Sequence, residues 1–413
     1  MGWKLIRHLL TLPPSLLWLV IQYFFGGLKY RRYRNSLRNA LKLKIFSTAL
    51  AVGVSNGKWV IPFSNSTLIR KIVPLQNPRL VKNIPGWGEQ YDANSIWLVK
   101  QPDRKLTDPV IIYSHGGGYF IQTSPSQIVS LMSVYHLLDT DKQKKTSILF
   151  LDYKLASRGH TLPTQLYQLH DTYSKLVSEG SSNILLMGDS AGGHLSIAYT
   201  QYLKTLSKSP LVYPRQLLLI SPWVKLHLLP SDFVKGNSWV DNEKYDMIHH
   251  SLVSNVYELK QIVGTEDLNS LVTSPGGKFP MLRSDWSDIT TFSSPDCDIF
   301  LVLGEDESFR TDILRWAKFA LDLPWDTVKY GDSERTFKTE NYEFERRNIE
   351  GQANLSAYVE PLGVHDGFFF FEDSASATIS KSLKAGKKPS ITDLKEKDYF
   401  AMARLTRFLN ETL

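Results

Sequence analysis

The stretch ILLMGDSAGG at residues 184–193 joins an apolar run of strand length to a serine that lies between glycines. A strand, the pattern G-x-S-x-G and a helix in succession are typical of a nucleophile elbow, a strained turn that exposes a serine hydroxyl. Gly188 and Gly192 fit that turn because a side chain at either position would collide with neighbouring backbone. The helix expected from Ala191 directs its N-terminal dipole at developing negative charge. We therefore predict that Ser190 is a nucleophile.

A second glycine motif precedes the elbow on a separate strand. The apolar run Val110–Ser114 leads into HGGG at residues 115–118. Glycines of this kind let a substrate approach the backbone, whose N–H groups then stabilise the oxyanion of a tetrahedral intermediate. His115 is expected to support the loop and not to transfer a proton. The expected oxyanion donors are the N–H groups of Gly117, Gly118 and Ala191, with Gly116 as an alternative.

The acid and the base that a nucleophilic serine needs are expected in the chain order Ser, acid, His. The loop GEDESFR at residues 304–310 follows an apolar run and offers three competing carboxylates, Glu305, Asp306 and Glu307. His365 is the only histidine downstream of that loop. We predict that His365 accepts the serine proton, and that one carboxylate fixes its tautomer and stabilises its cation.

No metal or other cofactor is expected. The chain has one cysteine, which excludes a zinc site built on clustered cysteines. His249 and His250 are adjacent, so on a helix they do not face one point, and no third ligand is evident beside them.

Strand-length apolar runs alternate with helix-length stretches from about residue 95 to the end of the chain. Buried strands that alternate with helices favour an α/β fold with a mostly parallel sheet covered on both faces. The stretch 225–292 breaks the alternation with polar, loop-rich sequence, and we interpret it as a cap-like insertion above the sheet. The chain shows no internal repeats.

The net charge of +7 is divided unevenly along the chain. Residues 1–88 contain 14 Lys or Arg and no acid, so the other 325 residues, with 34 basic and 41 acidic side chains, carry −7. The acidic body argues against a general nucleic-acid surface. The twenty uncharged residues 9–28 could cross a hydrocarbon layer of about 30 Å as a helix. The basic residues that follow could meet lipid phosphates.

Three regions are predicted: a membrane anchor with its basic flank at 1–44, a linker or docking arm at 45–94, and a catalytic domain at 95–413. The basic flank after the anchor places the body in the cytoplasm by the positive-inside rule. Three glycosylation sequons point to the opposite side of the membrane. The sequons begin at Asn65, Asn354 and Asn410.

With these motifs assembled, the chain resembles the hormone-sensitive-lipase group of α/β-hydrolases over roughly residues 95–413. LDYKLA at 151–156 and the Ser-Pro-Trp sequence at 221–223 add to the resemblance. The resemblance implies an α/β-hydrolase fold. In similar enzymes the acid lies three residues after the small residue that ends its strand, which favours Glu307 over Asp306.

Within that group the anchor and the acid loop look most like the yeast steryl acetyl hydrolases. Those are endoplasmic-reticulum membrane esterases that deacetylate sterols with a lumenal catalytic domain. The resemblance implies a single-pass, membrane-anchored serine carboxylic ester hydrolase acting on a lipophilic acetyl ester. The sequence departs from the group in two places: the acid is Glu where many members have Asp, and the base motif reads His-Asp-Gly-Phe where many have His-Gly-Phe.

Two other enzymatic hypotheses stay open: a general short-chain carboxylesterase or lipase, and an amidase of the N-formylkynurenine type. A binding module on an inactive hydrolase fold is disfavoured because both Ser190 and His365 are present. An apolar pocket would suit a lipophilic ester. The aromatic residues that could line such a pocket, or could equally belong to the core, are Trp223, Trp239, Trp286 and Phe368–Phe371.

Overall fold

A nine-stranded sheet forms the centre of the protein, whose computed structural model describes residues 2–206, 211–325 and 342–413. The strand order is β1-β2-β4-β3-β5-β6-β7-β9-β8. The six strands from β4 to β9 in that order pair in parallel, while β1, β2 and β8 pair antiparallel at the two edges. The strands are β1 Gln90–Asp92, β2 Ser95–Val99, β3 Val110–Ser114, β4 Ser147–Leu151, β5 Ile184–Asp189, β6 Gln216–Ile220, β7 Asp298–Gly304, β8 Glu343–Arg346 and β9 Asn354–Glu360.

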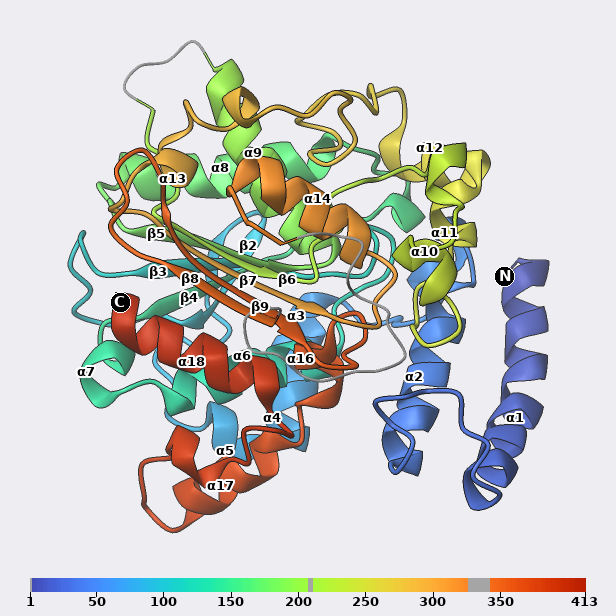
Figure 1. Cartoon of the computed structure of the whole chain (residues 1–413). Coiled ribbons are helices and arrows are strands. Elements are labelled where there is room, and N and C mark those ends of the chain that lie inside the picture. Colours follow the sequence, from blue (N-terminus) through green and yellow to red (C-terminus); the bar gives the residue numbers. More distant parts are fainter. Residues whose placement is uncertain (1, 207–210, 326–341) are drawn as a thin grey trace.

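Helices cover both faces of this sheet (Figure 1). One face packs against α8 (Thr164–Ser178), α9 (Ala191–Thr205) and α14 (Arg310–Ala320). The other face packs against α6 (Pro125–Leu137), α17 (Ala375–Lys384) and α18 (Phe400–Thr412). Alternate residues of each buried strand point to opposite faces and so enter two separate cores. The prediction of a mostly parallel, doubly covered sheet is therefore confirmed.

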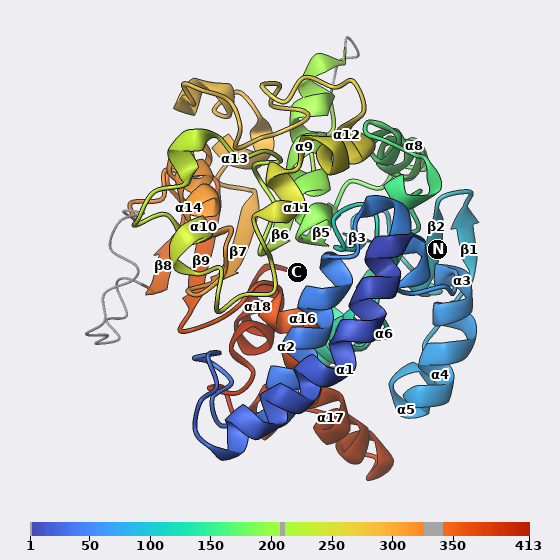
Figure 2. The same ribbon diagram turned by 90° about the vertical axis from the view of Figure 1, so that its right-hand side faces the viewer.

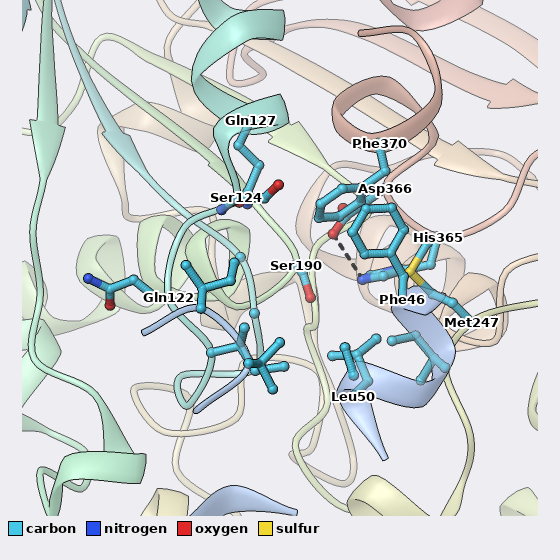
Figure 3. Close-up of a pocket in the computed structure, with 18 of the residues that line it drawn as sticks. Phe46, Leu50, Gln122, Ser124, Gln127, Ser190, Met247, His365, Asp366 and Phe370 are labelled. Atoms are coloured by element: carbon cyan, nitrogen blue, oxygen red, sulfur yellow. Dashed lines mark hydrogen bonds and ion pairs between the residues drawn. The ribbon is translucent and has the colours of Figure 1, made fainter. Parts of the chain in front are cut away.

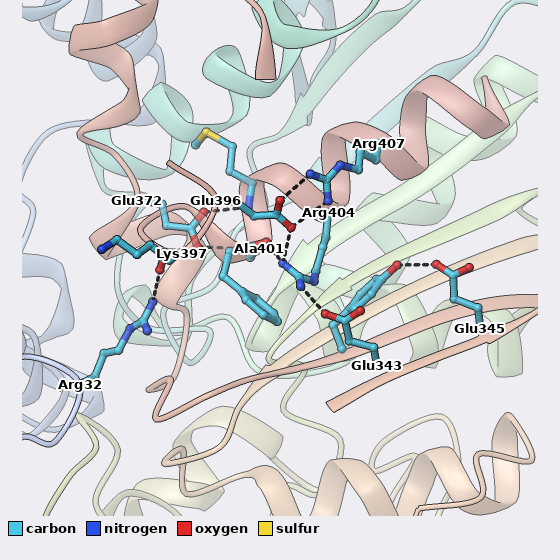
Figure 4. A network of polar contacts seen from close by, with 12 residues as sticks. Arg32, Glu343, Glu345, Glu372, Glu396, Lys397, Ala401, Arg404 and Arg407 are labelled. Atoms are coloured by element: carbon cyan, nitrogen blue, oxygen red, sulfur yellow. Dashed lines mark hydrogen bonds and ion pairs between the residues drawn. The ribbon is translucent and has the colours of Figure 1, made fainter. Parts of the chain in front are cut away.

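The C-terminal helix is held by a buried carboxylate (Figure 4). Glu372 accepts hydrogen bonds from the backbone N–H groups of Ala401 and Met402 in the first turn of α18, at 2.9 and 2.7 Å. These donors have no partner within the helix, so a carboxylate there satisfies them and complements the helix dipole. Glu372 directly follows α16 (Gly367–Phe371), so this contact links α18 to the loop that carries His365.

The 225–292 stretch forms short helices joined by irregular loops, which run across the sheet from the end of β6 to the start of β7 (Figure 1). The helices are α10 Ser238–Asp241, α11 Ser251–Ser254, α12 Val256–Val263 and α13 Thr290–Ser293. Trp239 and Trp286 are buried within this part of the protein. Trp239 donates its indole N–H to Asp312 at 2.8 Å. These two tryptophans therefore help to fix the insertion to the body.

The N-terminal residues form a helical hairpin of α1 (Trp3–Phe24) and α2 (Leu37–Leu50), which lies against the body (Figure 2). The expected boundary between residues 44 and 45 falls inside α2. Only α1 is both long and apolar enough to cross a membrane, among the ranges that the structure describes. The segment after α2 continues through a 3-10 turn (Val54–Trp59) and the short helices α3 (Asn65–Thr67), α4 (Val73–Gln76) and α5 (Pro78–Val81).

The three sequon asparagines all make contacts with the body. Asn65 is fully buried and donates its amide to Asp152 at 2.7 Å. Asn354 donates to the carbonyl of Pro295, and the side chain of Asn410 accepts from a backbone N–H. A glycan on Asn65 would require this part of the folded protein to open.

Candidate active site

Ser190 lies on a sharp turn between β5 and α9, at the carboxyl edge of the parallel strands. Its backbone adopts φ 48° and ψ −114°, a strained conformation for a residue with a side chain. A Cβ atom on Gly192 would lie 1.8 Å from the carbonyl oxygen of Ser114, and one on Gly188 would lie 2.2 Å from Gly192. The two glycines therefore allow the close approach of helix and strand that this turn requires.

The HGGG loop at residues 115–118 follows β3, and the side chain of Asp189 supports it through hydrogen bonds. One Asp189 oxygen accepts from the N–H of Gly116 at 2.9 Å and from the hydroxyl of Tyr113 at 2.8 Å, and the other accepts from Gln127 at 2.7 Å. The Gly116 N–H is thus directed at Asp189 and away from a substrate. The donors that remain for an oxyanion are the N–H groups of Gly117, Gly118 and Ala191.

His115 supports this loop. Its ring stacks on Tyr153 with centroids 4.3 Å apart, and its Nδ1–H donates to the carbonyl of Gly116 at 2.6 Å. Burial lowers the pKa of His115 to about 4, so the ring is neutral at physiological pH. Its contacts are those of a structural support for the glycine backbone.

In the acid loop at residues 304–310, Glu307 is the carboxylate that interacts electrostatically with His365. Its Oε2 accepts from the hydroxyl of Ser221 at 2.6 Å and from the N–H of Gly304 at 2.8 Å. Its Oε1 and the Nδ1 of His365 are both buried atoms without a hydrogen-bond partner among the described residues. Each of these two side chains shifts the pKa of the other electrostatically. Burial raises the pKa of Glu307 to about 7, although the charge of His365 opposes that rise.

Asp306 and Glu305 have other partners. Asp306 is buried, and it is bound by the guanidinium of Arg31, whose Nε donates to it at 2.8 Å. Glu305 accepts from the N–H of Leu362 at 2.8 Å and so supports the loop before the base. Of the three competing carboxylates, Glu307 is the one whose charge raises the pKa of His365, and Asp306 is turned toward the N-terminal segment.

His365 is held in place by three neighbours. Its backbone N–H donates to Asp246 at 2.9 Å, and its ring contacts Phe309 edge-on with centroids 4.7 Å apart. Its Nε2 pairs with Asp366 at 3.2 Å (Figure 3). Burial alone would lower the pKa of His365, but Asp366, with help from Glu307, outweighs burial and raises it to about 9. In this conformation the ring is a cation at neutral pH, and it must lose a proton before it can act as a base.

Two positioning groups had no assigned role in the sequence. Asp246, in the cap-like insertion, accepts hydrogen bonds from the backbone N–H groups of His365 and Ser308. It therefore links the loop that carries His365 to the acid loop. Ser221 donates to Glu307 and accepts from the N–H of Asp366 at 3.2 Å. The Ser-Pro-Trp match could have drawn attention to Ser221. No local pattern distinguishes Asp246 from other acids of the insertion.

An apolar cavity of about 310 Å³ opens onto Ser190 and His365 (Figure 3). One wall is α2, and the oxyanion loop and the base loop contribute others. Trp223 and Phe370 line the cavity, whereas Trp239 and Trp286 do not. Its apolar lining residues are Ile45, Phe46, Ala49, Leu50, Val60, Ile61, Ile121, Pro125, Trp223, Met247, Ile248, Leu252, Phe309 and Phe370.

Part of the basic flank is engaged by the body. Arg32 pairs with Glu360 at 2.6 Å and donates to the carbonyl of Lys397 at 3.2 Å (Figure 4). Lys42 pairs with Asp373 at 2.8 Å, two residues after α16. Together with Arg31, these side chains bind the loops that carry the acid and the base. Contact of the flank with lipid phosphates stays a prediction, and it would not involve these three side chains as they are paired here.

A serine on a nucleophile elbow and a buried histidine line one cavity at the carboxyl edge of a parallel sheet. Together with a buried carboxylate in the preceding loop, these are the groups with which α/β-hydrolases cleave esters. The protein is a serine ester hydrolase of this fold. The family model for steryl acetyl hydrolases matches residues 87–339, and the chain belongs to that family.

Individual relatives agree with this membership. The chain is 31% identical over 331 residues to mug81 of Schizosaccharomyces pombe, which is named as a candidate steryl acetyl hydrolase; the match covers 76% of this chain and 83% of the relative. It is 24% identical over 273 residues to steryl acetyl hydrolase 1 of Saccharomyces cerevisiae, covering 61% and 59%. A bacterial esterase of the hormone-sensitive lipase family has the same fold, with a TM-score of 0.51 at 17% identity, covering 90% and 98%.

Proposed function

We propose that the protein is a membrane-attached esterase of the endoplasmic reticulum that removes acetyl groups from sterols or similar lipophilic alcohols. The observation that carries this proposal is the apolar cavity that Ser190 and α2 both line, with the apolar helix α1 packed against α2. A lipophilic alcohol fits such a lining, while the small acetyl group needs little room beside the serine. The names of the family and of its yeast relatives support the same substrate class.

We propose the following reaction for the residues at this cavity. His365, once neutral, takes the proton of Ser190 as the serine oxygen attacks the acetyl carbonyl carbon. The N–H groups of Gly117, Gly118 and Ala191 stabilise the oxyanion. The C–O bond to the alcohol breaks, the leaving oxygen takes the proton from His365, and the acetyl group stays on the serine. Water then attacks the acyl-enzyme with His365 again as base, which releases acetate.

The substrate class is tested with purified full-length protein in lipid vesicles that contain an acetylated sterol. We expect free sterol to form with the wild type and not with Ser190→Ala. A water-soluble acetyl ester, a long-chain acyl ester and an aryl formamide are offered in parallel. Turnover of the soluble ester without the sterol ester would favour a general carboxylesterase, and preferred formamide cleavage would favour an amidase. Either result would overturn the proposed substrate.

A further inference from the structure

The N–H groups that would stabilise the oxyanion come from two separate segments of the chain. Gly117 and Gly118 lie in the loop after β3, whereas Ala191 begins α9 after β5. Donors of this kind stabilise the transition state only when they are held in place before the reaction. One link between the two segments, from Asp189 to the N–H of Gly116, is described above. A second link lies farther along both segments.

This second link is a buried hydrogen bond between Tyr119 and His194. The hydroxyl oxygen of Tyr119 lies 2.6 Å from Nδ1 of His194, and the two rings meet edge-on with centroids 5.6 Å apart. Both side chains are buried. Tyr119 directly follows Gly118, and His194 lies three residues after Ala191 in the first turn of α9. The hydrogen bond therefore joins the two donor segments close to the donors themselves.

A third segment fixes the direction of this hydrogen bond. Nε2 of His194 lies 2.8 Å from the carbonyl oxygen of Thr273, in the cap-like insertion. Burial lowers the pKa of His194 to about 4, so the ring is neutral at physiological pH. A carbonyl oxygen can only accept, so the single N–H hydrogen of the neutral ring is on Nε2. Nδ1 is then an acceptor, and the hydroxyl of Tyr119 donates to it.

The backbone of Tyr119 is in a strained conformation that needs support from its neighbours. Its φ is 65°, after 106° at Gly117 and 60° at Gly118. A positive φ is uncommon for a residue with a large side chain, and it persists only where the surrounding contacts determine it. The carbonyl of Tyr119 accepts from the N–H of Ala156 at 2.8 Å, and its hydroxyl is held by His194. Loss of the hydroxyl contact would allow the residue next to Gly118 to relax.

We infer that Tyr119 and His194 are positioning residues, which hold the loop of Gly117 and Gly118 in register with Ala191 at the start of α9. Neither side chain is among those that line the catalytic cavity, so their effect on the reaction is indirect. The inference rests on the proposed acyl transfer at Ser190, and it holds whichever alcohol the ester contains. Because Thr273 belongs to the cap-like insertion, the same contacts connect that insertion to the oxyanion donors.

Two substitutions of the histidine separate its two hydrogen bonds. The amide of His194→Asn takes the place of Nδ1 and can accept from Tyr119, whereas the longer amide of His194→Gln takes the place of Nε2 and can donate to Thr273. Tyr119→Phe removes only the hydroxyl. Each full-length variant is assayed with a water-soluble acetyl ester, and thermal unfolding is the folding control. The matched variant is Tyr173→Phe, which removes a hydroxyl that donates to the carbonyl of Val212 away from the cavity.

The variants that lose the Tyr119 contact should be slow. We expect kcat to fall about 10- to 100-fold in Tyr119→Phe and in His194→Gln, below the loss of about 10²–10³-fold typical of a deleted donor, because Asp189 still supports the loop. KM should change less than about 3-fold. The double variant should be about as slow as either single one, since both remove the same bond.

His194→Asn restores an acceptor for Tyr119, so its kcat should return to within about 5-fold of the wild type. Tyr173→Phe should keep the wild-type kcat, since its hydroxyl lies outside the cavity. A wild-type kcat in Tyr119→Phe, or equal losses in His194→Asn and His194→Gln, would overturn the inference.

An alkyl trifluoromethyl ketone reports on the oxyanion donors directly. The Ser190 oxygen bonds to the ketone carbon, the carbonyl π bond breaks to leave an oxyanion, and the serine proton passes to His365. The adduct thus resembles the tetrahedral intermediate, so its inhibition constant should rise by the same factor as kcat/KM falls in Tyr119→Phe. A lower kcat with an unchanged inhibition constant would mean that the pair only stabilises the fold, which would overturn the inference. Turnover retained in Ser190→Ala would instead contradict the proposed function, and this inference with it.

Discussion

The catalytic loops bury charged side chains, whereas the N-terminal hairpin exposes apolar ones. Around His365, buried carboxylates on different elements are bound by backbone N–H groups, hydroxyls or a cation, as Asp246 and Glu307 show. On α1, by contrast, large apolar side chains such as Trp3 and Phe24 stand in solvent. A site that moves protons needs fixed, desolvated partners, whereas a surface that meets lipid needs uncovered apolar area. The difference fits our proposal that catalysis and membrane attachment use separate parts of the chain.

The two regions meet at the acid loop, where adjacent carboxylates serve different partners. Glu307 turns inward to Ser221 and the base, and Asp306 turns outward to Arg31 of the hairpin. This contact could pass a disturbance of the hairpin to the catalytic loops. Variants of each carboxylate and of the contact between the regions would show how far the two regions depend on each other.

The largest contrast is expected between Glu307→Gln and Asp306→Asn. An amide at 307 cannot stabilise the cation of His365, so kcat for an acetyl ester should fall about 10³–10⁴-fold. Asp306→Asn should lower kcat less than about 10-fold, because the Asp306 side chain binds Arg31 and does not stabilise the His365 cation. Steady-state kinetics with thermal unfolding as a folding control measures both. A larger loss in Asp306→Asn than in Glu307→Gln would reverse the assignment of the acid.

The second prediction concerns pH. His365 must be neutral to take a proton from Ser190, so kcat/KM should rise with pH through the pKa of about 9 that Asp366 imposes. Asp366→Asn removes the charge that raises this pKa and leaves burial, which lowers it, to dominate. The midpoint of the rise should therefore move down by about one pH unit or more. Asp373→Asn, which removes a more distant carboxylate on the same segment, is the control. An unchanged midpoint in Asp366→Asn would show that this carboxylate does not control the base.

Removing the contact between the regions should have a moderate effect. Arg31→Ala leaves Asp306 buried without this guanidinium, and we expect the free energy of unfolding to fall by about 1–3 kcal/mol. Arg34→Ala removes an exposed cation of the same segment and should change it by less than about 0.5 kcal/mol. Denaturant unfolding measures both variants. Equal stabilities would mean that the Arg31 pair does not fasten the hairpin.

The smallest effect is expected in the cavity wall. Phe46 of α2 lines the cavity and lies against Phe370, with ring centroids 4.3 Å apart. Phe46→Ala should raise KM for a lipophilic acetyl ester about 3- to 10-fold and leave KM for a small soluble ester nearly unchanged. Phe63→Ala, at an exposed position outside the cavity, is the matched variant. Similar changes for both esters would mean that α2 does not contact the alcohol part of the substrate.

Much of the sheet and the nucleophile could be predicted because their signals are local. A strand, a glycine-flanked serine and a helix must follow one another for steric reasons, so residues 184–193 carry their own structure. The edge strands β1 and β8 were not predicted, since short, partly exposed strands take their form from a partner. Asp246 and the packing of α1 on α2 depend on residues far apart in the chain, and no local pattern specifies such contacts.

The most direct test of the account is the reaction of Ser190 itself. Full-length protein is treated with a fluorophosphonate, the adduct is located by peptide mass mapping, and turnover of an acetyl ester is measured before and after treatment. Labelling should fall on Ser190 alone, abolish turnover, and be absent from Ser190→Ala, which should be inactive yet folded. Turnover retained in Ser190→Ala, or an inactivating adduct on another residue, would contradict the assignment of this protein as a serine ester hydrolase that uses Ser190.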